Sequence, residues 1–150
     1  MLAVYPRTTG FAYAVVEGRK RLVDWGQLKL GVNTDEEFRL RLEELIVGPN
    51  SPTMMVLEDC SNTRRGERTR SRIETALGAA QSFNLETLLI SPAEVRVALQ
   101  LPTDASKHVL VERVIELFPE LLHSKPNRRI WQHDPRMYVF EAVTLCLAAE

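Results

Sequence analysis

The apolar residues of the first thirty positions fall into three short runs, at residues 2–5, 11–16 and 22–30. Each run has the length of a strand and is bounded by polar, glycine or proline residues, so each predicts a β-strand. Because proline cannot donate a backbone hydrogen bond to a neighbouring strand, we expect the first strand to stop at Pro6. The connections are short and Gly18 marks the second turn, which favours an antiparallel meander.

Further along the chain, strand patterns alternate with helical ones. Apolar runs at residues 53–57 and 87–90 predict two more strands. Apolar residues at helical spacing predict helices that begin near Thr34, Ile73, Ser91, Asp104 and Asp134. Strands that are entered through helices pair in parallel, so this order predicts an α/β fold. We expect a five-stranded mixed sheet, with three antiparallel strands and then two parallel ones, flanked by helices.

The strand at residues 53–57 is followed directly by two carboxylates, Glu58 and Asp59. In open α/β sheets, ligands and metals gather at the C-terminal ends of strands because the loops fan apart there and leave a crevice. A plainer interpretation is that the acidic pair only begins a solvated loop. The other residues that the fold brings to this edge decide between the two.

Composition is ordinary for a soluble globular protein. With 150 residues, of which 45% are hydrophobic and 26% charged, we expect a single domain over residues 1–150. No apolar run approaches the roughly 18 residues of a membrane-spanning helix and the first residues lack a signal-peptide layout, so we expect a cytoplasmic protein without a membrane partner. Cys60 and Cys146 cannot form a disulfide framework, and neither they nor His108, His123 and His133 have the spacing of a zinc site.

Positive charge is concentrated directly after the acidic strand end, although the net charge of the chain is only −1. This segment contains five arginines against one acid; the arginines are Arg64, Arg65, Arg68, Arg70 and Arg72. Such a run can be a solvated face. It can also bind phosphate, because guanidinium groups contact phosphates in pairs of hydrogen bonds, which gives a salt-sensitive affinity for nucleic acid.

Short motifs along the chain match one family pattern in order and spacing. They are Val4-Tyr5-Pro6 before Gly10-Phe11-Ala12-Tyr13, Val56-Leu57-Glu58, Ala76-Leu77-Gly78-Ala79-Ala80, Ser91-Pro92-Ala93-Glu94-Val95-Arg96, Ala105-Ser106-Lys107 and Glu141-Ala142-Val143. Together they resemble the RuvC-type Holliday-junction resolvases over nearly the whole chain. The resemblance implies a ribonuclease H-like fold, a homodimer, and branched or double-stranded DNA as the partner. Arg96 and Lys107 match positions that are basic in the family.

The resemblance also implies where a catalytic site would lie. In such nucleases four carboxylates hold two divalent cations about 4 Å apart. The second acid matches Glu58 and the last matches Glu141, but Tyr5 and Tyr138 stand at the first and third positions. Asp134 lies seven residues before Glu141 and therefore shares its helical face, which makes it a candidate replacement. The implied catalytic and metal-binding residues are thus Glu58, Asp134 and Glu141.

The charge of these residues favours a degenerate nuclease site. Two magnesium ions bring four positive charges, whereas two or three carboxylates offer two or three negative ones, so at most one weakly held Mg2+ or Mn2+ is expected. We therefore favour a nucleic-acid-binding protein without efficient two-metal hydrolysis. Two alternatives stay open: an active metal-dependent endonuclease on branched DNA with a rearranged carboxylate site, assisted by Asp59, and a structural or partner-binding protein without a nucleic-acid role.

Two of the acids also have interpretations that need no metal. Asp134 precedes a proline at a predicted helix start, where an aspartate serves as a cap. Glu141 interrupts an otherwise apolar helix, and a buried acid without a partner would cost several kcal/mol. It therefore needs a cation, a hydrogen-bond donor or water, and Tyr5 or Tyr138 could be that donor.

Overall fold

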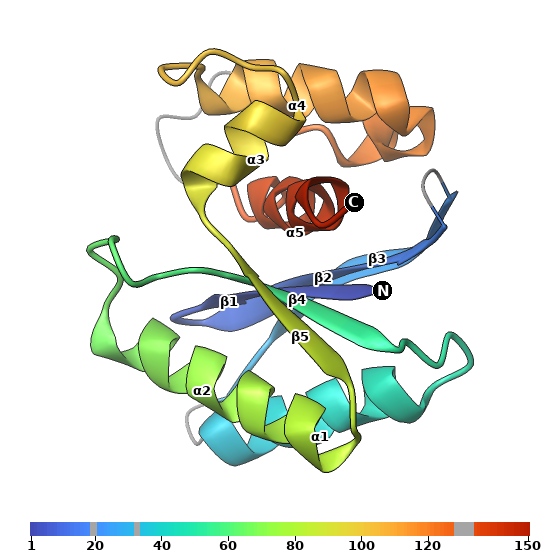
Figure 1. Ribbon diagram of the computed structural model, residues 1–150, viewed down its shortest axis with the longest axis vertical. Helices are drawn as coiled ribbons and strands as arrows, with labels where there is room; N and C mark the ends of the chain where they lie inside the picture. Colours follow the sequence, from blue (N-terminus) through green and yellow to red (C-terminus); the bar gives the residue numbers. More distant parts are fainter. Residues whose placement is uncertain (19–20, 32–33, 128–133) are drawn as a thin grey trace.

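A mixed five-stranded sheet forms the centre of the molecule (Figure 1). The computed structural model describes residues 1–18, 21–31, 34–127 and 134–150. The strands are β1 (Leu2–Arg7), β2 (Gly10–Glu17), β3 (Arg21–Lys29), β4 (Met54–Glu58) and β5 (Glu86–Ile90), in the spatial order β3-β2-β1-β4-β5. The pairs β1–β2 and β2–β3 are antiparallel, whereas β1–β4 and β4–β5 are parallel. The predicted mixed sheet is confirmed.

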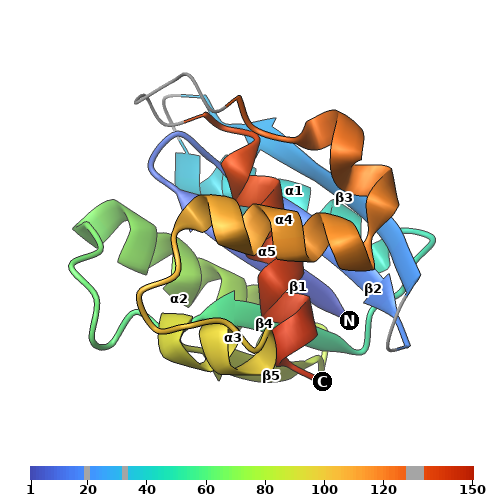
Figure 2. The ribbon, with the colours of Figure 1, turned by 90° about the horizontal axis from the view of Figure 1, so that it is seen from above.

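Helices cover both faces of this sheet. They are α1 (Thr34–Val47), α2 (Glu67–Ser82), α3 (Pro92–Ala98), α4 (Lys107–Leu117), the 3-10 helix η1 (Pro119–Ser124) and α5 (Met137–Ala148). Helices α1 and α2 lie on one side, and α3, α4 and α5 on the other (Figure 1). Seen from above, α4 lies across α5, which packs against the sheet (Figure 2).

Each side of the sheet has its own hydrophobic core. Leu2 and Val4 of β1 belong to the core under α1 and α2, whereas Ala3 and Tyr5 belong to the core under α5. Side chains alternate between the faces of a strand, so the odd-numbered positions of β1 all point toward α5. This alternation places Tyr5 on the side of the sheet where the C-terminal helix lies.

The prediction that β1 stops at Pro6 is wrong, because the strand continues to Arg7 and Pro6 pairs with Phe11 of β2. On its other side β1 pairs with β4 only at Leu2, Ala3 and Val4. Beyond Val4 the strand has a partner on one side only, so a residue without an N–H can be accommodated there.

The starts of α2, α4 and α5 differ from the predictions by three to six residues. Helix α2 begins at Glu67, so it already includes part of the arginine run. Helix α3 begins as predicted, with the Ser91 hydroxyl accepting from the Glu94 amide and the Glu94 carboxylate accepting from the Ser91 amide. Helix α4 takes its cap from Ser106 rather than from Asp104. Within the described residues, no helix is both long and apolar enough to cross a lipid bilayer.

Candidate functional site

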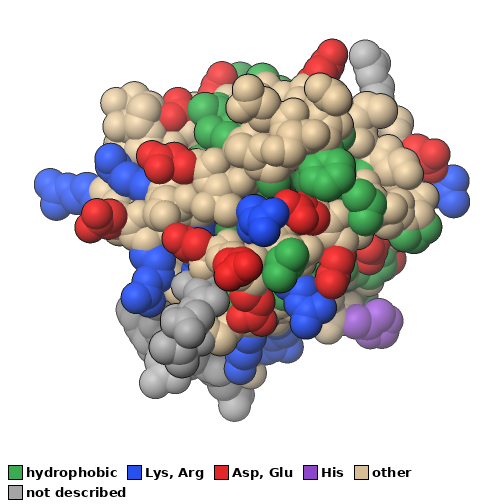
Figure 3. All heavy atoms as spheres, turned by 90° about the horizontal axis from the view of Figure 1, so that it is seen from below, with side chains coloured by type: hydrophobic (Ala, Val, Ile, Leu, Met, Phe, Trp, Pro, Cys, Tyr) green, Lys and Arg blue, Asp and Glu red, His purple; other side chains and the backbone are tan. Residues whose placement is uncertain are grey.

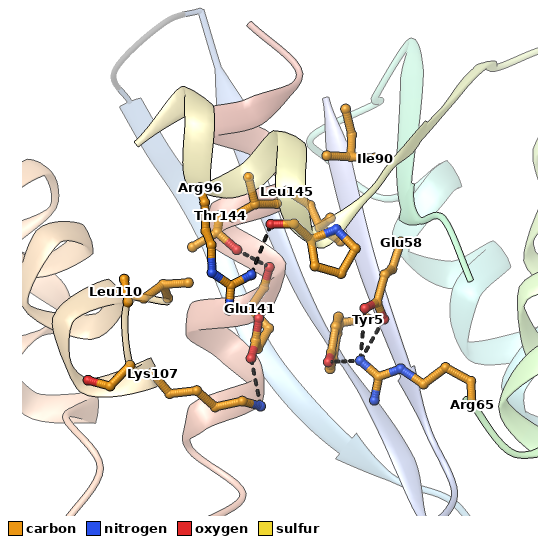
Figure 4. Close-up of a pocket in the computed structure, with 14 residues that line it drawn as sticks. Tyr5, Glu58, Arg65, Ile90, Arg96, Lys107, Leu110, Glu141, Thr144 and Leu145 are labelled. Atoms are coloured by element: carbon orange, nitrogen blue, oxygen red, sulfur yellow. Dashed lines mark hydrogen bonds and ion pairs between the residues drawn. The ribbon is translucent and has the colours of Figure 1, made fainter. Parts of the chain in front are cut away.

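A pocket opens at the end of β4, between the sheet and helices α3, α4 and α5 (Figure 4). It has a volume of about 650 Å³, part of which is open to solvent. Its charged lining residues are Glu58, Arg65, Arg96, Lys107 and Glu141. The fold therefore brings together the two acids that match the family and three of the predicted basic residues.

Glu58 ends β4 as a buried carboxylate, with 7% of the residue exposed. The Arg65 Nη2 atom donates to both of its oxygens, at 2.9 and 2.7 Å. The same nitrogen also donates to the Tyr5 hydroxyl. A buried carboxylate is costly without a counter-charge, so Arg65 is what allows Glu58 to lie inside the protein.

Glu141 of α5 has a cationic partner as well. Its Oε1 atom lies 2.9 Å from the Nζ atom of Lys107, the first residue of α4. The Glu141 side chain is 16% exposed and that of Lys107 is 58% exposed. The sequence analysis expected Glu141 to have a cation, a hydrogen-bond donor or water as partner, and in the structure this partner is a lysine from another helix.

The two tyrosines at the acid positions lie next to each other. The Tyr5 and Tyr138 rings are stacked, with centroids 6.2 Å apart and planes 24° apart. The Arg65 guanidinium lies 5.4 Å from the Tyr5 ring centroid, and that of Arg7 lies 3.1 Å from the Tyr138 centroid. Cations near aromatic faces are attracted by the ring electrons. Each of the two stacked rings thus has an arginine as a neighbour.

Electrostatics keeps the Tyr5 hydroxyl protonated. Burial raises its pKa, and the negative charges of Glu141 and Glu58 raise the pKa further, while Arg65 lowers it. This agrees with the position of Tyr5 between the two acidic side chains (Figure 4). At the position where the resemblance implies a metal-binding carboxylate, this chain therefore has a neutral phenol.

Arg7 lies over the Tyr138 ring beside the pocket without lining it, and the sequence analysis missed this neighbour of the site. Burial lowers the pKa of its guanidinium, and the Glu141 and Glu58 carboxylates oppose that change. The available signal was its position two residues after Tyr5 on a strand, which places both side chains on one face of the sheet.

These residues do not fit a two-metal centre as they are arranged. Glu58 and Glu141 each already have a cation of the chain as partner, and the other two acid positions hold tyrosines. In the part of the chain that is described, no group of three or more His, Cys, Asp or Glu side chains is placed to hold a metal ion. His108 and His123 are exposed, and His133 lies outside the described residues. Weak binding of a single Mg2+ or Mn2+ stays a prediction.

Asp134 is not among the residues that line the pocket. Its carboxylate accepts from the Arg136 side chain, at 2.6 to 3.1 Å, and from the backbone amides of Arg136 and Asn127, both at 3.0 Å. The hydrogen bond from the Arg136 side chain is the main reason that the pKa of Asp134 falls to about 2. Asp134 thus fastens the turn before α5, but the prediction that it caps this helix is wrong, because the N-cap is Arg136 and no side chain caps the helix. The role of Asp134 as a metal ligand stays a prediction without a contact to support it.

Asp59, unlike its neighbour Glu58, does not take part in the pocket. Its carboxylate accepts from the backbone amide of Ser61, at 2.9 Å, and this hydrogen bond lowers the pKa of Asp59. It is also absent from the pocket lining. The contacts of Asp59 are those of a residue that starts a loop.

The arginine run divides among three environments. Arg65 lies in the pocket, and Arg72 is fully buried. Arg64, Arg68 and Arg70 are exposed, so these three form the part of the run that nucleic acid could contact. A linear cluster of like charges therefore does not form one continuous surface.

Arg72 has a structural environment. Its Nη1 atom donates to the backbone carbonyls of Arg7 and Gly10, which lie on either side of the β1–β2 turn. Its Nε atom lies 3.9 Å from a carboxylate oxygen of Asp35. Burial lowers the pKa of Arg72. This arginine ties the end of β1 to helix α2 and has no surface with which to contact DNA.

Arg96 lies on the other wall of the pocket. Its Nη1 atom donates to the Pro92 carbonyl at 3.1 Å, and its Nε atom is buried without a hydrogen-bond partner in the described part of the chain.

Acidic and basic side chains are mixed on the face formed by α1 and α2 (Figure 3). That face has pairs such as Arg39–Glu43 and Arg41–Glu44.

The fold is that of the RuvC-type Holliday-junction resolvases, within the ribonuclease H-like class. The structure of Thermus thermophilus RuvC matches with a TM-score of 0.73 and 19% identity, covering 99% of this chain and 92% of RuvC. RuvC of the same organism in complex with a Holliday junction matches with a TM-score of 0.72 and 16% identity, covering 99% and 91%. Fowlpox virus resolvase in complex with its substrate Holliday junction DNA matches with a TM-score of 0.60 and 13% identity, covering 99% and 96%.

The sequence itself gives no such match. No model of a protein family matches it, and no curated protein does. The similarity is therefore one of three-dimensional structure, and it confirms the fold that the order of short motifs predicted.

Proposed function

We propose that this chain is a RuvC-like nucleic-acid-binding protein that binds branched DNA and does not hydrolyse it efficiently. The observation that carries the proposal is the pairing of both family-matched acids with cations of the same chain, Glu58 with Arg65 and Glu141 with Lys107. DNA as the partner is supported by the structural neighbours, two of which are complexes with a Holliday junction.

The absence of efficient hydrolysis follows from charge. Two-metal hydrolysis needs carboxylates that hold two cations beside the scissile phosphate. Here a divalent ion would have to displace Arg65 from a buried carboxylate, or Lys107 from a half-buried one, and would find tyrosines at the two remaining positions. A standard two-metal centre is therefore not expected to form.

The proposed binding surface combines the pocket with the exposed arginines of the segment that follows β4. Arg64, Arg68 and Arg70 are exposed after the β4 end, and Lys107 is exposed at the start of α4. Each phosphate that such a cation neutralises releases counterions, so the logarithm of the affinity for duplex arms falls with log salt by about 0.9 per contact. We therefore expect binding that weakens steeply between low and physiological salt.

The test measures binding and cleavage of one labelled four-way junction. In EDTA and at low salt we expect a fluorescence anisotropy change at sub-micromolar to micromolar protein, and in Mg2+ or Mn2+ we expect no cleavage products on a denaturing gel. Arg64→Gln with Arg68→Gln should weaken binding, whereas the control Arg39→Gln with Arg41→Gln, whose arginines already pair with Glu43 and Glu44, should not.

Two results would contradict the proposal in different ways. Robust metal-dependent cleavage that Glu58→Gln abolishes would establish an active nuclease. Undetectable binding to the junction and to duplex DNA at low salt would instead favour a structural or partner-binding protein.

A further inference from the structure

Among the described residues, the two cations that pair with the acids have more hydrogen-bond donors than their contacts use. The hydrogen bonds from the Arg65 guanidinium to Glu58 and Tyr5 all come from Nη2. A guanidinium has five N–H donors and an ammonium has three, so Arg65 and Lys107 can each contact a further anion without leaving their acids. Both side chains are partly exposed, at 31% and 58%.

The pocket and its rim also have an excess of positive charge. Three lining cations, Arg65, Arg96 and Lys107, face two lining carboxylates, Glu58 and Glu141, which leaves one positive charge in excess. The N-terminus of α4 begins beside the pocket, with Ser106 in its lining, and a helix N-terminus adds partial positive charge. Such a pocket repels a divalent cation and attracts an anion.

We infer that this pocket binds one phosphate group of the nucleic acid directly, between Arg65 and Lys107, with these two side chains in the place of the metal ions. The inference rests on the proposed function and names the group that binds at that site. No bond is made or broken in this step. The phosphate is held by charge and hydrogen bonds alone, so no divalent ion is needed for it to bind.

In this arrangement, removing a carboxylate should change the affinity for the junction in the direction opposite to that expected for a metal-dependent site. When a carboxylate binds a metal that in turn binds phosphate, its removal weakens binding. Here the Glu141 carboxylate repels the phosphate and occupies Lys107, so Glu141→Gln should tighten binding of the junction about threefold to tenfold. Removing the cation with Lys107→Met should weaken binding by about tenfold, because a charge-assisted contact to phosphate is lost.

The experiment titrates the labelled junction with each full-length variant in EDTA and in Mg2+ at the same ionic strength. Two controls on α4 remove the same charges outside the pocket: Glu116→Gln matches Glu141→Gln, and Arg113→Met matches Lys107→Met. We expect equal affinity with and without Mg2+, tighter binding only for Glu141→Gln, and weaker binding mainly for Lys107→Met. Circular dichroism and thermal melting confirm that each variant is folded.

Weaker binding by folded Glu141→Gln, or binding that requires Mg2+, would overturn the inference while nucleic-acid binding itself stands. If Glu141→Gln does not fold, an unchanged affinity for Lys107→Met relative to Arg113→Met would overturn it equally. Absence of any junction binding by the unmodified protein at low salt would contradict the proposed function, and the inference with it.

Discussion

Replacing Arg65 by methionine tests whether this arginine is what permits a buried carboxylate at the end of β4. Methionine keeps a long apolar side chain and removes the charge and all donors. Glu58, whose side chain is 9% exposed, then loses its counter-charge, and the Tyr5 hydroxyl loses a donor. We expect a lower free energy of unfolding.

The size of the loss lies between two known cases. Breaking a fully buried ion pair costs about 3–5 kcal/mol, and losing an exposed pair costs about 1 kcal/mol or less. Because Arg65 is 31% exposed, we take about 2 kcal/mol for this pair. For a domain of this size, a loss of that size lowers the melting temperature by about 4–8 °C.

The assay is a double-mutant cycle of urea unfolding with Arg65→Met, Glu58→Gln and the double variant. Glu58→Gln keeps an acceptor for Arg65 and should cost about 1 kcal/mol. The double variant should lose less than the sum of the single losses, by about 1 kcal/mol, because the charge left unpaired by Arg65→Met is absent. Arg41→Met is the control, since it breaks an exposed pair with Glu44 and should cost about 0.5 kcal/mol or less.

A loss for Arg65→Met no larger than that for Arg41→Met would refute the reasoning. So would losses that add in the double variant, because additivity would mean that Arg65 and Glu58 do not stabilise each other.

Other features of the molecule give further expectations. Arg72→Ala should lower the free energy of unfolding by about 2 kcal/mol or more, because it leaves two carbonyls of the β1–β2 turn without their buried donor. Urea unfolding measures this loss. A variant with full stability but reduced affinity for the junction would contradict this structural role. Asp134→Asn should cost about 1 kcal/mol or less at neutral pH, because Asn keeps some of the hydrogen bonds that fasten the turn. The pKa of Asp134 in the folded protein is about 2, below its usual value, so its contribution to the free energy of unfolding is present above about pH 4 and is lost as pH falls toward 2. The melting temperatures of the variant and of the unmodified protein should therefore converge at acid pH. A difference that stays constant with pH would contradict this role of Asp134. Arg64→Gln with Arg68→Gln should reduce the slope of log affinity against log salt by about 1 to 2, measured by anisotropy. The implied homodimer is checked by light scattering at micromolar protein, where a monomer mass with and without junction DNA would contradict it.

Much of the fold could be predicted because its signals are local. The lengths and spacing of apolar runs predicted the strands and helices, and the connection lengths predicted which strands pair in which direction. The errors were local as well. Pro6 continues β1 because the neighbouring strand ends before it, which the residues around Pro6 do not reveal.

The five arginines after β4 show where sequence reasoning ends. As a linear run they are equivalent, yet Arg65 turns into the pocket, Arg72 is buried and the remaining three face solvent. Which of them meets a carboxylate depends on the path of the loop between β4 and α2 and on the rotation of α2. Those are set by packing against the other segments.

For the candidate site, Glu58, Glu141, Tyr5 and Tyr138 were located from the sequence through the resemblance of short motifs to the RuvC-type pattern, because such a match needs only the order and spacing of residues. Only the tertiary structure decided the partners. Arg65 reaches the Tyr5 hydroxyl across 60 residues of sequence, and Lys107 of α4 reaches Glu141 of α5. Charges neutralise each other through space, between segments that the fold brings together. The acids of this site could therefore be located from the sequence, whereas the cations that pair with them, and so set the chemistry of the site, could not.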